Sequence, residues 1–537
     1  MSETASARPA APRTDAGRAV VIGGGIAGLA TAALLAREGW AVSLFEARDQ
    51  VGGRAGVWEA DGFRFDTGPS WYLMPEVFDH FFRLMGTTTA EQLNLLRLDP
   101  AYRVYSEPPA GTASDPIDIR SGRELSTQLF ESIEPGAGAA LAEYLDSAKD
   151  AYDLAVTRFL YDTYETTAGL RDPALLRRVP QLAPLLTTTL SRHVERRFSD
   201  KRLQQVLGYP AVFLGGSPYG VPSLYHLMSH LDLADGVLYP QGGLYEVIRA
   251  VERVARGAGV SIETGAEVTS IVTTPTAGGR AQATGITLAD GRRVDADLVV
   301  SSADLHFTET QLLPEPLRTY PEQWWEKRTP SPGALLLLLG VEGDLPQLAH
   351  HTLLFTEDWR SNFDDIFGEH TRVPDPASIY VCKPSATDPT VAPEGSENLF
   401  VLVPIPADPS LGHGGVDRGG SPRIEAAADR VIAQISQWCN IPDLAERITV
   451  RRTIAPGDFE HDFHAWRGNA LGLAHTLRQS AVFRPRNASK KVDSLAYAGA
   501  SALPGIGLPM CLISAELVVK RLRGDRSPGP IAEPAAV

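Results

Sequence analysis

Three glycines near the amino terminus, Gly23, Gly25 and Gly28, have the spacing G-x-G-x-x-G. In this pattern the first glycine permits a tight turn, the second lets a pyrophosphate approach the main chain, and the third lets a helix and a strand pack closely. Glu46 lies eighteen residues after Gly28, where a carboxylate can hydrogen-bond the hydroxyls of an unphosphorylated ribose. The spacing predicts a dinucleotide site; a plain strand-to-helix turn without a ligand is the alternative.

A second glycine pair follows in the run Val51-Gly52-Gly53-Arg54. The glycines leave room for a cofactor beside the main chain, and Arg54 offers a fork of donors to a phosphate or a flavin carbonyl. A dehydrogenase that binds only NAD has no need of this second loop, so the two motifs together favour FAD. Downstream, residues 62–70 predict a strand and a tight turn near the flavin, where Asp66 either approaches the cofactor or caps a turn.

A third motif lies near the other end of the chain, where a strand ending in Gly499-Ala500 is followed by Gly507-Leu508-Pro509-Met510. We expect a helix to begin at Pro509, because proline is favoured in the first turn. The amino-terminal end of such a helix can direct its dipole at the flavin pyrimidine ring and stabilise the negative charge of reduced flavin. A packed connection without a ligand is the alternative.

From these motifs we predict a set of cofactor-binding residues in three separated stretches of the chain. They are Gly23, Gly25, Ile26, Ala27, Gly28, Glu46, Ala47, Gly52, Gly53, Arg54, Val268, Gly499, Ala500, Gly507, Leu508, Pro509 and Met510.

No metal site is predicted. The three cysteines are far apart and lack C-x-x-C spacing, which also fits a reducing compartment. His226 and His230 are four residues apart, as ligands on a helix are, but no third ligand accompanies them, so structural or surface roles are favoured. His350-His351 is expected to be a loop pair, and the sequence leaves open whether His461 and His464 face the site.

The elements that must position these motifs alternate along the chain. Apolar runs at residues 19–22 and 41–45 flank a helix at 29–37 and predict a β-α-β unit, and strand patterns return between 260 and 300 and at 495–498. This alternation predicts an α/β fold with a discontinuous dinucleotide-binding domain, which the two glycine motifs assign to FAD, and a second domain inserted between its pieces. The predicted boundaries are 18–100, 238–305 and 490–524 for the FAD-binding domain, 101–237 and 306–489 for the substrate and helical domain, and 1–17 and 525–537 for disordered tails.

The composition excludes several classes of protein. The 537 residues include 50 Lys and Arg against 65 Asp and Glu, a formal charge of −15, whereas nucleic-acid binding needs a basic face. The longest aliphatic run, at residues 334–341, is too short to span a bilayer, and the amino-terminal stretch lacks the apolar core of a secretory signal. We therefore expect a cytoplasmic protein whose membrane contact is peripheral.

Three further segments carry a more specific resemblance than the glycine motifs. The runs GFRFDTGPSWYLMP at 62–75, YPQGGL at 239–244 and GASALPGIGLPMCLISAEL at 499–517 resemble bacterial carotenoid desaturases of the phytoene-desaturase type, within the FAD-dependent amine-oxidase and carotenoid-desaturase superfamily. The resemblance covers nearly the whole chain except both tails. It implies a discontinuous Rossmann-like FAD-binding domain with an inserted α+β substrate domain and a helical membrane-facing region. It also implies bound FAD, phytoene desaturated towards neurosporene or lycopene, oxygen or a quinone as electron acceptor, and peripheral docking at the inner face of the cell membrane.

Two departures from the family pattern bear on the chemistry. Many relatives carry a polar Thr-His pair where this chain has Ala502 and Leu503, which makes an acid-base role at this spot doubtful. Monoamine oxidases commonly have an acidic residue after the glycine of the last strand motif, where this chain has Ala500, which weakens an amine-oxidase interpretation.

The catalytic residues stay unassigned, and the flavin itself is expected to be the main catalytic group. A carbon–hydrogen bond beside a double bond can be desaturated by hydride transfer to flavin N5 and loss of a proton from the adjacent carbon. A related carotenoid ketolase, hydroxylating oxidase or isomerase is an alternative. A non-enzymatic isoprenoid carrier is less favoured, because the residues expected to bind FAD are retained.

A linear hydrocarbon requires a long apolar tunnel. Candidate lining comes from residues 71–74, 78–82, 213–214 and 335–339, with ordinary core packing as the alternative for each. The stretch 175–198 mixes leucine with arginine and predicts a helix that lies on anionic lipid, or else a solvated helix face.

Overall fold

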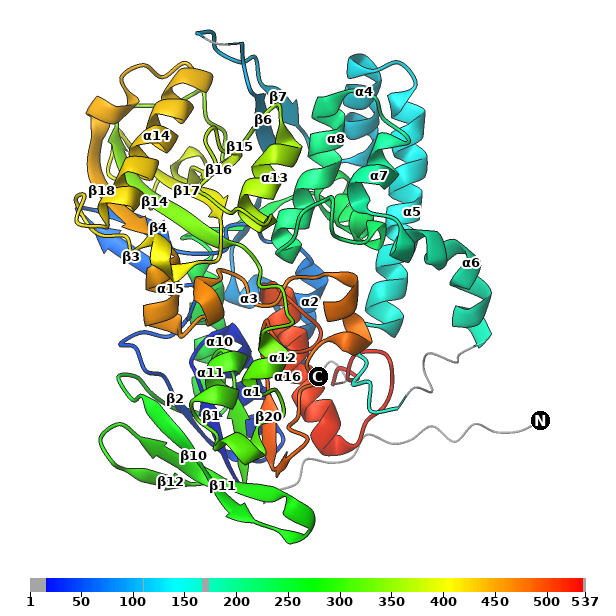
Figure 1. Ribbon diagram of the computed structural model, residues 1–537, viewed down its shortest axis with the longest axis vertical. Helices are drawn as coiled ribbons and strands as arrows, with labels where there is room; N and C mark the ends of the chain where they lie inside the picture. Colours follow the sequence, from blue (N-terminus) through cyan, green and yellow to red (C-terminus); the bar gives the residue numbers. More distant parts are fainter. Residues whose placement is uncertain (1–15, 110, 167–172, 535–537) are drawn as a thin grey trace.

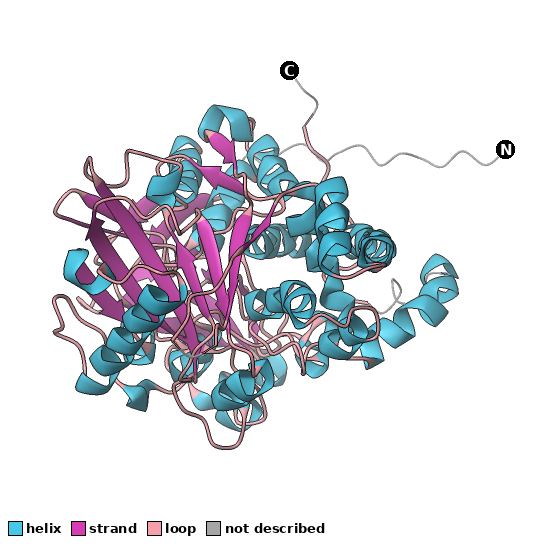
Figure 2. Ribbon diagram, turned by 90° about the horizontal axis from the view of Figure 1, so that it is seen from above, coloured by secondary structure: helices cyan, strands magenta, loops and turns pink. Residues whose placement is uncertain are grey.

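The computed structural model describes residues 16–109, 111–166 and 173–534. Most of the predicted tail at residues 1–17 therefore lies outside the described residues. Two large sheets and a lobe of helices build the molecule, with the sheets at the lower centre and upper left of Figure 1 and the helical lobe at the upper right. Seen from above, the strands lie at the left and centre with helices around them, and the right-hand side is helical (Figure 2).

A five-stranded parallel sheet gathers strands from the beginning, middle and end of the chain, as the sequence predicts. In spatial order they are β20 (Leu495–Tyr497), β13 (Leu298–Ser301), β1 (Arg18–Ile22), β2 (Ala41–Phe45) and β9 (Ser261–Glu263). Central β1 places Val21 opposite Val300 on one side and Leu44 on the other. Since both faces of the sheet are covered, its strands are short apolar runs.

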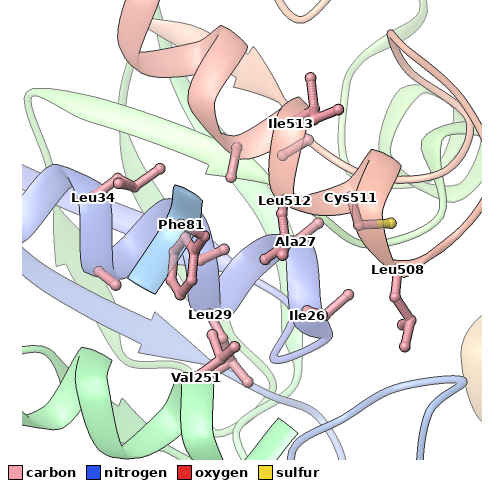
Figure 3. Packing of buried hydrophobic residues seen from close by; sticks show 14 of the residues in the cluster. Ile26, Ala27, Leu29, Leu34, Phe81, Val251, Leu508, Cys511, Leu512 and Ile513 are labelled. Atoms are coloured by element: carbon pink, nitrogen blue, oxygen red, sulfur yellow. The ribbon is translucent and has the colours of Figure 1, made fainter. Parts of the chain in front are cut away.

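One face of this sheet packs on three helices, α1 (Ile26–Arg37), α10 (Tyr245–Gly257) and α16 (Leu508–Arg523). Helix α1 is rich in alanine and lies between the other two, with Leu29 near Val251 of α10 and Ala27 near Leu512 of α16 (Figure 3). The predicted helices are present; α1 begins at Ile26, three residues earlier than expected, and α16 at Leu508.

The other face of the parallel sheet is covered by a smaller sheet. Its strands are β10 (Val268–Pro275), β11 (Ala281–Leu288), β12 (Arg293–Asp295) and β19 (Val492–Asp493). Strands β10 and β11 pair antiparallel as a hairpin, with Pro275 opposite Ala281 next to the turn. Val20 and Phe45 of the parallel sheet pack against Ile286 of β11.

A seven-stranded sheet forms the second large layer. In spatial order its strands are β18 (Ile448–Ile454), β14 (Gly333–Glu342), β17 (Ser396–Ile405), β16 (Ile379–Cys382), β15 (His351–Phe355), β6 (Tyr102–Ser106) and β7 (Ile117–Ile119). Leucines of β14 alternate between its faces: Leu335 and Leu337 pack towards α14 (Pro422–Trp438), whereas Leu336 and Leu338 join the core beneath the helical lobe. This alternation restricts the leucines that can reach the site to those of one face of β14.

Two-stranded ribbons and short helices complete the fold. The ribbons are β3 (Val57–Ala60) with β4 (Phe63–Asp66) and β5 (Leu95–Arg97) with β8 (Leu238–Pro240). Further helices are α2 (Pro75–Leu84), α3 (Thr89–Gln92), α9 (Met228–His230), α11 (Leu305–Thr310), α12 (Glu322–Trp325), α13 (Trp359–Phe367) and α15 (Pro456–Phe463).

The helical lobe contains α4 (Arg123–Ile133), α5 (Ala137–Arg158), α6 (Pro173–Thr187), α7 (Leu190–Glu195) and α8 (Lys201–Gly208). The single helix predicted at 175–198 is two helices, because Thr189 adopts an extended conformation and its side chain accepts the N–H of Arg192 to cap α7. Helix α6 projects from the body (Figure 1). Among the described residues, none of the helices is both long and apolar enough to cross a membrane.

The described part of the predicted carboxy-terminal tail, residues 525–534, packs against the body. Ile531 is buried and its N–H donates to the carboxylate of Glu516, and Glu533 lies 3.0 Å from His80 of α2. The prediction of disorder is wrong for this stretch, because α2 and α16 supply polar and apolar partners for it.

Candidate active site

A cavity of about 780 Å3 with a mostly apolar lining extends from the carboxyl ends of β1 and β2 to helix α6. All the predicted cofactor-binding residues line it, with the exception of Gly28. The three motifs therefore share one cavity although they are far apart in sequence. Ligands of parallel α/β sheets bind at this carboxyl edge.

Gly28 and Gly25 have different roles in the first motif. A Cβ atom at Gly28 would lie 2.0 Å from the carbonyl oxygen of Gly23, so Gly28 allows α1 to pack on the turn instead of lining the cavity. A Cβ at Gly25 would meet nothing within 4 Å, which leaves open space beside the start of α1. A ligand's pyrophosphate fits a main chain left bare in this way.

The first two motifs contact each other directly, and Glu46 lies beside this contact. The Glu46 carboxylate accepts the N–H groups of Gly24, at 2.6 Å, and Arg48, at 3.0 Å. The N–H of Gly52 donates to the carbonyl of Gly24 at 2.9 Å. These bonds hold the Glu46 carboxylate at the cavity edge, where its position suits a ribose.

Arg54 lines the cavity and has buried N–H donors that form no hydrogen bond with the protein. Its Nη2 atom lies 3.6 Å from the Asp304 carboxylate, too far for a hydrogen bond, and both Nε and Nη2 are buried without a hydrogen-bond partner. Because buried donors are normally satisfied, this arginine fits an anionic or carbonyl-bearing ligand. No sequence motif marks Asp304, although it follows β13 at the same carboxyl edge as the glycines.

The third motif closes the same cavity from the carboxy-terminal side. The N–H of Gly499 donates to the Ser514 hydroxyl of α16 at 3.0 Å, and Gly499 lies beside Ala27 of the first motif. Helix α16 begins directly after Gly507, and its first turn lines the cavity. The open main chain at Gly25, the free donors of Arg54 and this helix end together fit FAD.

Asp66 is a helix cap and not a cavity residue. Its carboxylate accepts the N–H groups of Leu244 at 2.7 Å and Tyr245 at 2.9 Å, at the start of α10. Burial raises the pKa of Asp66 to about 6, although the two main-chain donors oppose this. Asp66 therefore acts as a cap, as the alternative predicts, but the helix that it caps is α10, which lies far along the chain.

The histidines separate by position. His464 lines the cavity and stacks on Phe307, with ring centroids 3.9 Å apart, whereas the ring of His461 is exposed. His226 is buried and bonds the Ser147 hydroxyl at 2.9 Å, and His230 lies 3.5 Å from the Asp235 carboxylate, so both take structural roles.

His350 and His351 are not the loop pair that the sequence predicts, because His351 begins β15 and both rings are buried. Ligand atoms of these two residues and Cys382 lie within 4.8 Å of one another. Burial lowers the pKa of both rings and raises that of the Cys382 thiol, so the thiol stays protonated. His351 bonds Tyr380 at 2.8 Å, and we assign the group to a polar layer behind the cavity wall.

Tyr225 and His475 line the cavity near the third motif, although no sequence motif marks them. The Tyr225 hydroxyl lies 2.7 Å from His475 Nδ1 and donates to the Ser480 hydroxyl at 2.9 Å. Burial lowers the pKa of His475 well below its usual value, so the ring is neutral. The pair cannot be predicted from a local sequence pattern, because 250 residues separate its members.

Part of the predicted tunnel lining reaches the cavity. The lining includes Trp71, Leu73, Met74, Phe213, Leu214 and Leu336. Tyr72, the run 78–82 and the other leucines of 335–339 do not line it, because they pack into the protein cores.

The cavity reaches the surface beside α6. Leu186 of α6, Leu477 and Phe483 line the cavity and are among the exposed large apolar residues, with Phe483 62% exposed. Exposed apolar side chains that rim an opening mark a site of contact with an apolar partner.

Comparisons with known proteins agree with this geometry. The family model described as flavin containing amine oxidoreductase matches residues 26–523. A carotenoid 3,4-desaturase from Haloarcula japonica is 43% identical, over 94% of this chain and 98% of the relative. A zeta-carotene-forming phytoene desaturase from Myxococcus xanthus is 37% identical, over 95% and 94%.

A solved oxidoreductase structure from Methanosarcina mazei shares the fold, with a TM-score of 0.60 and 18% identity, over 94% of this chain and 100% of that one. The chain therefore belongs to the flavin-containing amine oxidoreductase family and, within it, to the carotenoid desaturases, and it is an FAD-dependent oxidoreductase.

Proposed function

We propose that this protein desaturates a linear C40 carotenoid and that its substrate is phytoene, converted towards neurosporene or lycopene. The observation that carries the proposal is the apolar cavity that extends from the glycine motifs to the exposed side chains of Leu477 and Phe483. A hydrocarbon offers no polar groups, so its recognition depends on burial of apolar surface, roughly 25 cal/mol per Å2. The names of the relatives support the same class of substrate.

The protein's part in the reaction is to bind, orient and exclude water. FAD, when bound, supplies the acceptor for a hydride from a carbon–hydrogen bond beside a double bond. Glu46 and Arg54 would hold the ribose and a phosphate or flavin carbonyl, respectively. Trp71 and Leu336 belong to the apolar wall that would hold the polyene and keep water from the reacting carbons.

A second candidate is desaturation at C3–C4 near the end of a carotenoid that already carries more double bonds. It is favoured by the 43% identity to the Haloarcula japonica carotenoid 3,4-desaturase, against 37% for the phytoene desaturase from Myxococcus xanthus. The two candidates share the cofactor site and differ in the substrate that reduces the flavin.

Peripheral docking at the inner face of the cell membrane, in a cytoplasmic protein, is part of the proposal. Such docking would bring the rim formed by Leu186, Leu477 and Phe483 to the lipid that dissolves the substrate. Arg177, Arg192 and Arg196 of the neighbouring helices would face anionic headgroups.

The decisive experiment offers the holoprotein each carotenoid in liposomes without oxygen. Phytoene should bleach the flavin absorbance and yield more unsaturated products on chromatography. Bleaching by a more unsaturated carotenoid, but not by bound phytoene, would reject the first candidate in favour of the second. Reoxidation by oxygen or by a quinone, followed by absorbance, then identifies the acceptor.

A further inference from the structure

Arg484 is a fully buried cation in the wall of the cofactor end of the cavity. Its guanidinium donates only to main-chain carbonyls: Ala502 at 3.1 Å, Gln479 at 3.1 Å, Leu473 at 3.0 Å, and Ala500. These bonds use four of the five guanidinium N–H groups and supply no negative charge.

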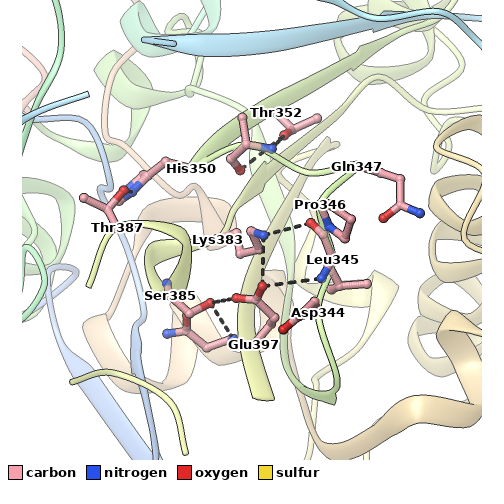
Figure 4. Close-up of polar contacts among 12 residues, drawn as sticks. Asp344, Leu345, Pro346, Gln347, His350, Thr352, Lys383, Ser385, Thr387 and Glu397 are labelled. Carbon is pink, nitrogen blue, oxygen red and sulfur yellow. Dashed lines mark hydrogen bonds and ion pairs between the residues drawn. The ribbon is translucent and has the colours of Figure 1, made fainter. Parts of the chain in front are cut away.

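Other buried cations of the described residues have carboxylates nearby. Lys383 lies 3.0 Å from Glu397 (Figure 4), and Arg451 lies 2.6 Å from Glu425. The pKa of Lys520 is lowered by burial, and nearby carboxylates, those of Asp525 and Glu516 among them, oppose this effect. Within residues 16–109, 111–166 and 173–534, no carboxylate forms an ion pair with Arg484, and burial is the main cause that lowers its pKa. A buried charge without a counter-charge is strongly destabilising, so its retention needs a reason.

The bonds of Arg484 join two walls of the cavity. Ala500 belongs to the third glycine motif and lines the cavity, whereas Leu473 and Gln479 belong to the stretch that contains the lining residues His475 and Leu477. The guanidinium lies behind these walls, so it bears on a ligand through its charge and through the shape of the main chain, without touching the ligand.

A second source of positive potential converges on the same place. Helix α16 presents its amino-terminal end to the cavity at Leu508–Cys511, and the positive end of a helix dipole favours an anion. Burial raises the pKa of the Cys511 thiol in that first turn, and the charges of Arg54 and Arg484 oppose this rise. The cation and the helix end therefore favour negative charge on a ligand that lies against the third motif.

We propose that Arg484 is a positioning residue that braces the Ala500–Ala502 wall and supplies a fixed positive charge that favours reduced FAD over oxidised FAD. The inference rests on membership of the FAD-binding family and is independent of which carotenoid is the substrate. Burial lowers the pKa of Arg484 to about 10, so the guanidinium keeps its charge at neutral pH.

Redox titration of bound FAD in three variants tests the charge, and it needs no carotenoid. Arg484→Gln keeps amide donors for the carbonyls and removes the charge; Arg484→Lys keeps the charge and loses the fork. If the charge favours reduced FAD tenfold, Arg484→Gln lowers the two-electron midpoint potential by about 30 mV, whereas Arg484→Lys stays closer to the parent. Arg280→Met, which removes an exposed arginine paired with Asp493, is the matched control and leaves the potential unchanged.

Two results would overturn the electrostatic role: a parental potential in Arg484→Gln, or equal shifts in the Gln and Lys variants. Should Arg484→Gln not fold, the Lys variant still decides, because a shift of 30 mV or more with the charge retained contradicts the proposal. Fluorescence titration of FAD into the apoproteins measures the affinity for oxidised FAD. This affinity should fall in both variants, because both lose part of the hydrogen bonding that holds the Ala500–Ala502 wall.

Discussion

The Nε2 atom of His475 accepts a hydrogen bond from the main-chain N–H of Ile506, at 3.2 Å, inside the third glycine motif. On the other side of the ring, Nδ1 lies 2.7 Å from the Tyr225 hydroxyl, which itself donates to Ser480. A neutral imidazole has one N–H, so its proton lies on Nδ1 and points to the Tyr225 oxygen. The lone pair of Nε2 is thus committed to the main chain.

This arrangement predicts that His475 is structural and is not the acceptor of the substrate's proton. His475→Phe leaves the buried N–H of Ile506 unpaired, which should lower the free energy of unfolding by about 1–3 kcal/mol in urea titrations. His475→Gln retains an acceptor and should lose less stability. Equal loss of activity in both variants, with parental stability, would show instead that the ring takes part in the chemistry.

Replacement by alanine should affect two glycines of the first motif in different ways: stability falls at one position and FAD affinity at the other. Gly28→Ala drives a Cβ to 2.0 Å from the Gly23 carbonyl, so the apoprotein should lose about 3 kcal/mol or more, or fail to fold. Gly25→Ala meets open space and its φ of −67° suits alanine, so the apoprotein should keep its stability while FAD binding weakens at least tenfold. Thermal unfolding of apoprotein and FAD titration check both. Full FAD affinity in Gly25→Ala would place the pyrophosphate elsewhere.

The sequence predicts the cofactor end of the molecule better than the substrate end. Gly23, Glu46 and Gly499 lie at strand ends in one sheet, and local spacing suffices to find them because each motif has its own turn chemistry. The contacts of Asp66 with α10 and of Arg484 with Ala500 bring together segments that have no local pattern in common. Such contacts arise only when the lobes pack together.

The apolar residues that line the cavity are likewise hard to predict from the sequence. The run 335–339 has leucine at every position, so no period marks the inner face. The pleat of β14 places Leu336 and Leu338 on that face, and of these two Leu336 lines the cavity. Likewise, Phe78 looks like tunnel lining in sequence but packs on Tyr72, with ring centroids 4.4 Å apart.

Membrane docking should depend on the apolar rim of the cavity. Replacing Leu477 and Phe483 together by serine removes exposed apolar surface beside the opening and should reduce flotation with anionic liposomes severalfold. Val416→Ser is the matched control, because Val416 is also exposed, at 50%, but does not line the cavity. Unchanged flotation of the double variant would move the docking surface away from this rim.

Asp232 should make stability depend on pH near neutrality. The Asp232 carboxylate is buried in the helical lobe, where Oδ2 accepts the hydroxyls of Tyr209 at 2.8 Å and Tyr102 at 3.1 Å and Oδ1 has no partner. Burial raises its pKa to about 7, against the donation from the two hydroxyls. A raised pKa means that the native state holds the proton more tightly than the unfolded state. The resulting stability is complete below the unfolded pKa near 3.8 and is lost as the pH rises to 7.

Asp232→Asn keeps an oxygen acceptor for both tyrosines and does not ionise, so it isolates this contribution. Since each unit of pKa shift corresponds to about 1.4 kcal/mol, the stability of the variant relative to the parent should rise by about 2–3 kcal/mol between pH 5 and pH 8. Urea unfolding at several pH values measures this difference. Asp153→Asn, at an exposed pair with Lys149, is the control and should give a difference that does not vary with pH. A difference for Asp232→Asn that is equally flat would mean that this carboxylate is already ionised in the native protein at pH 5.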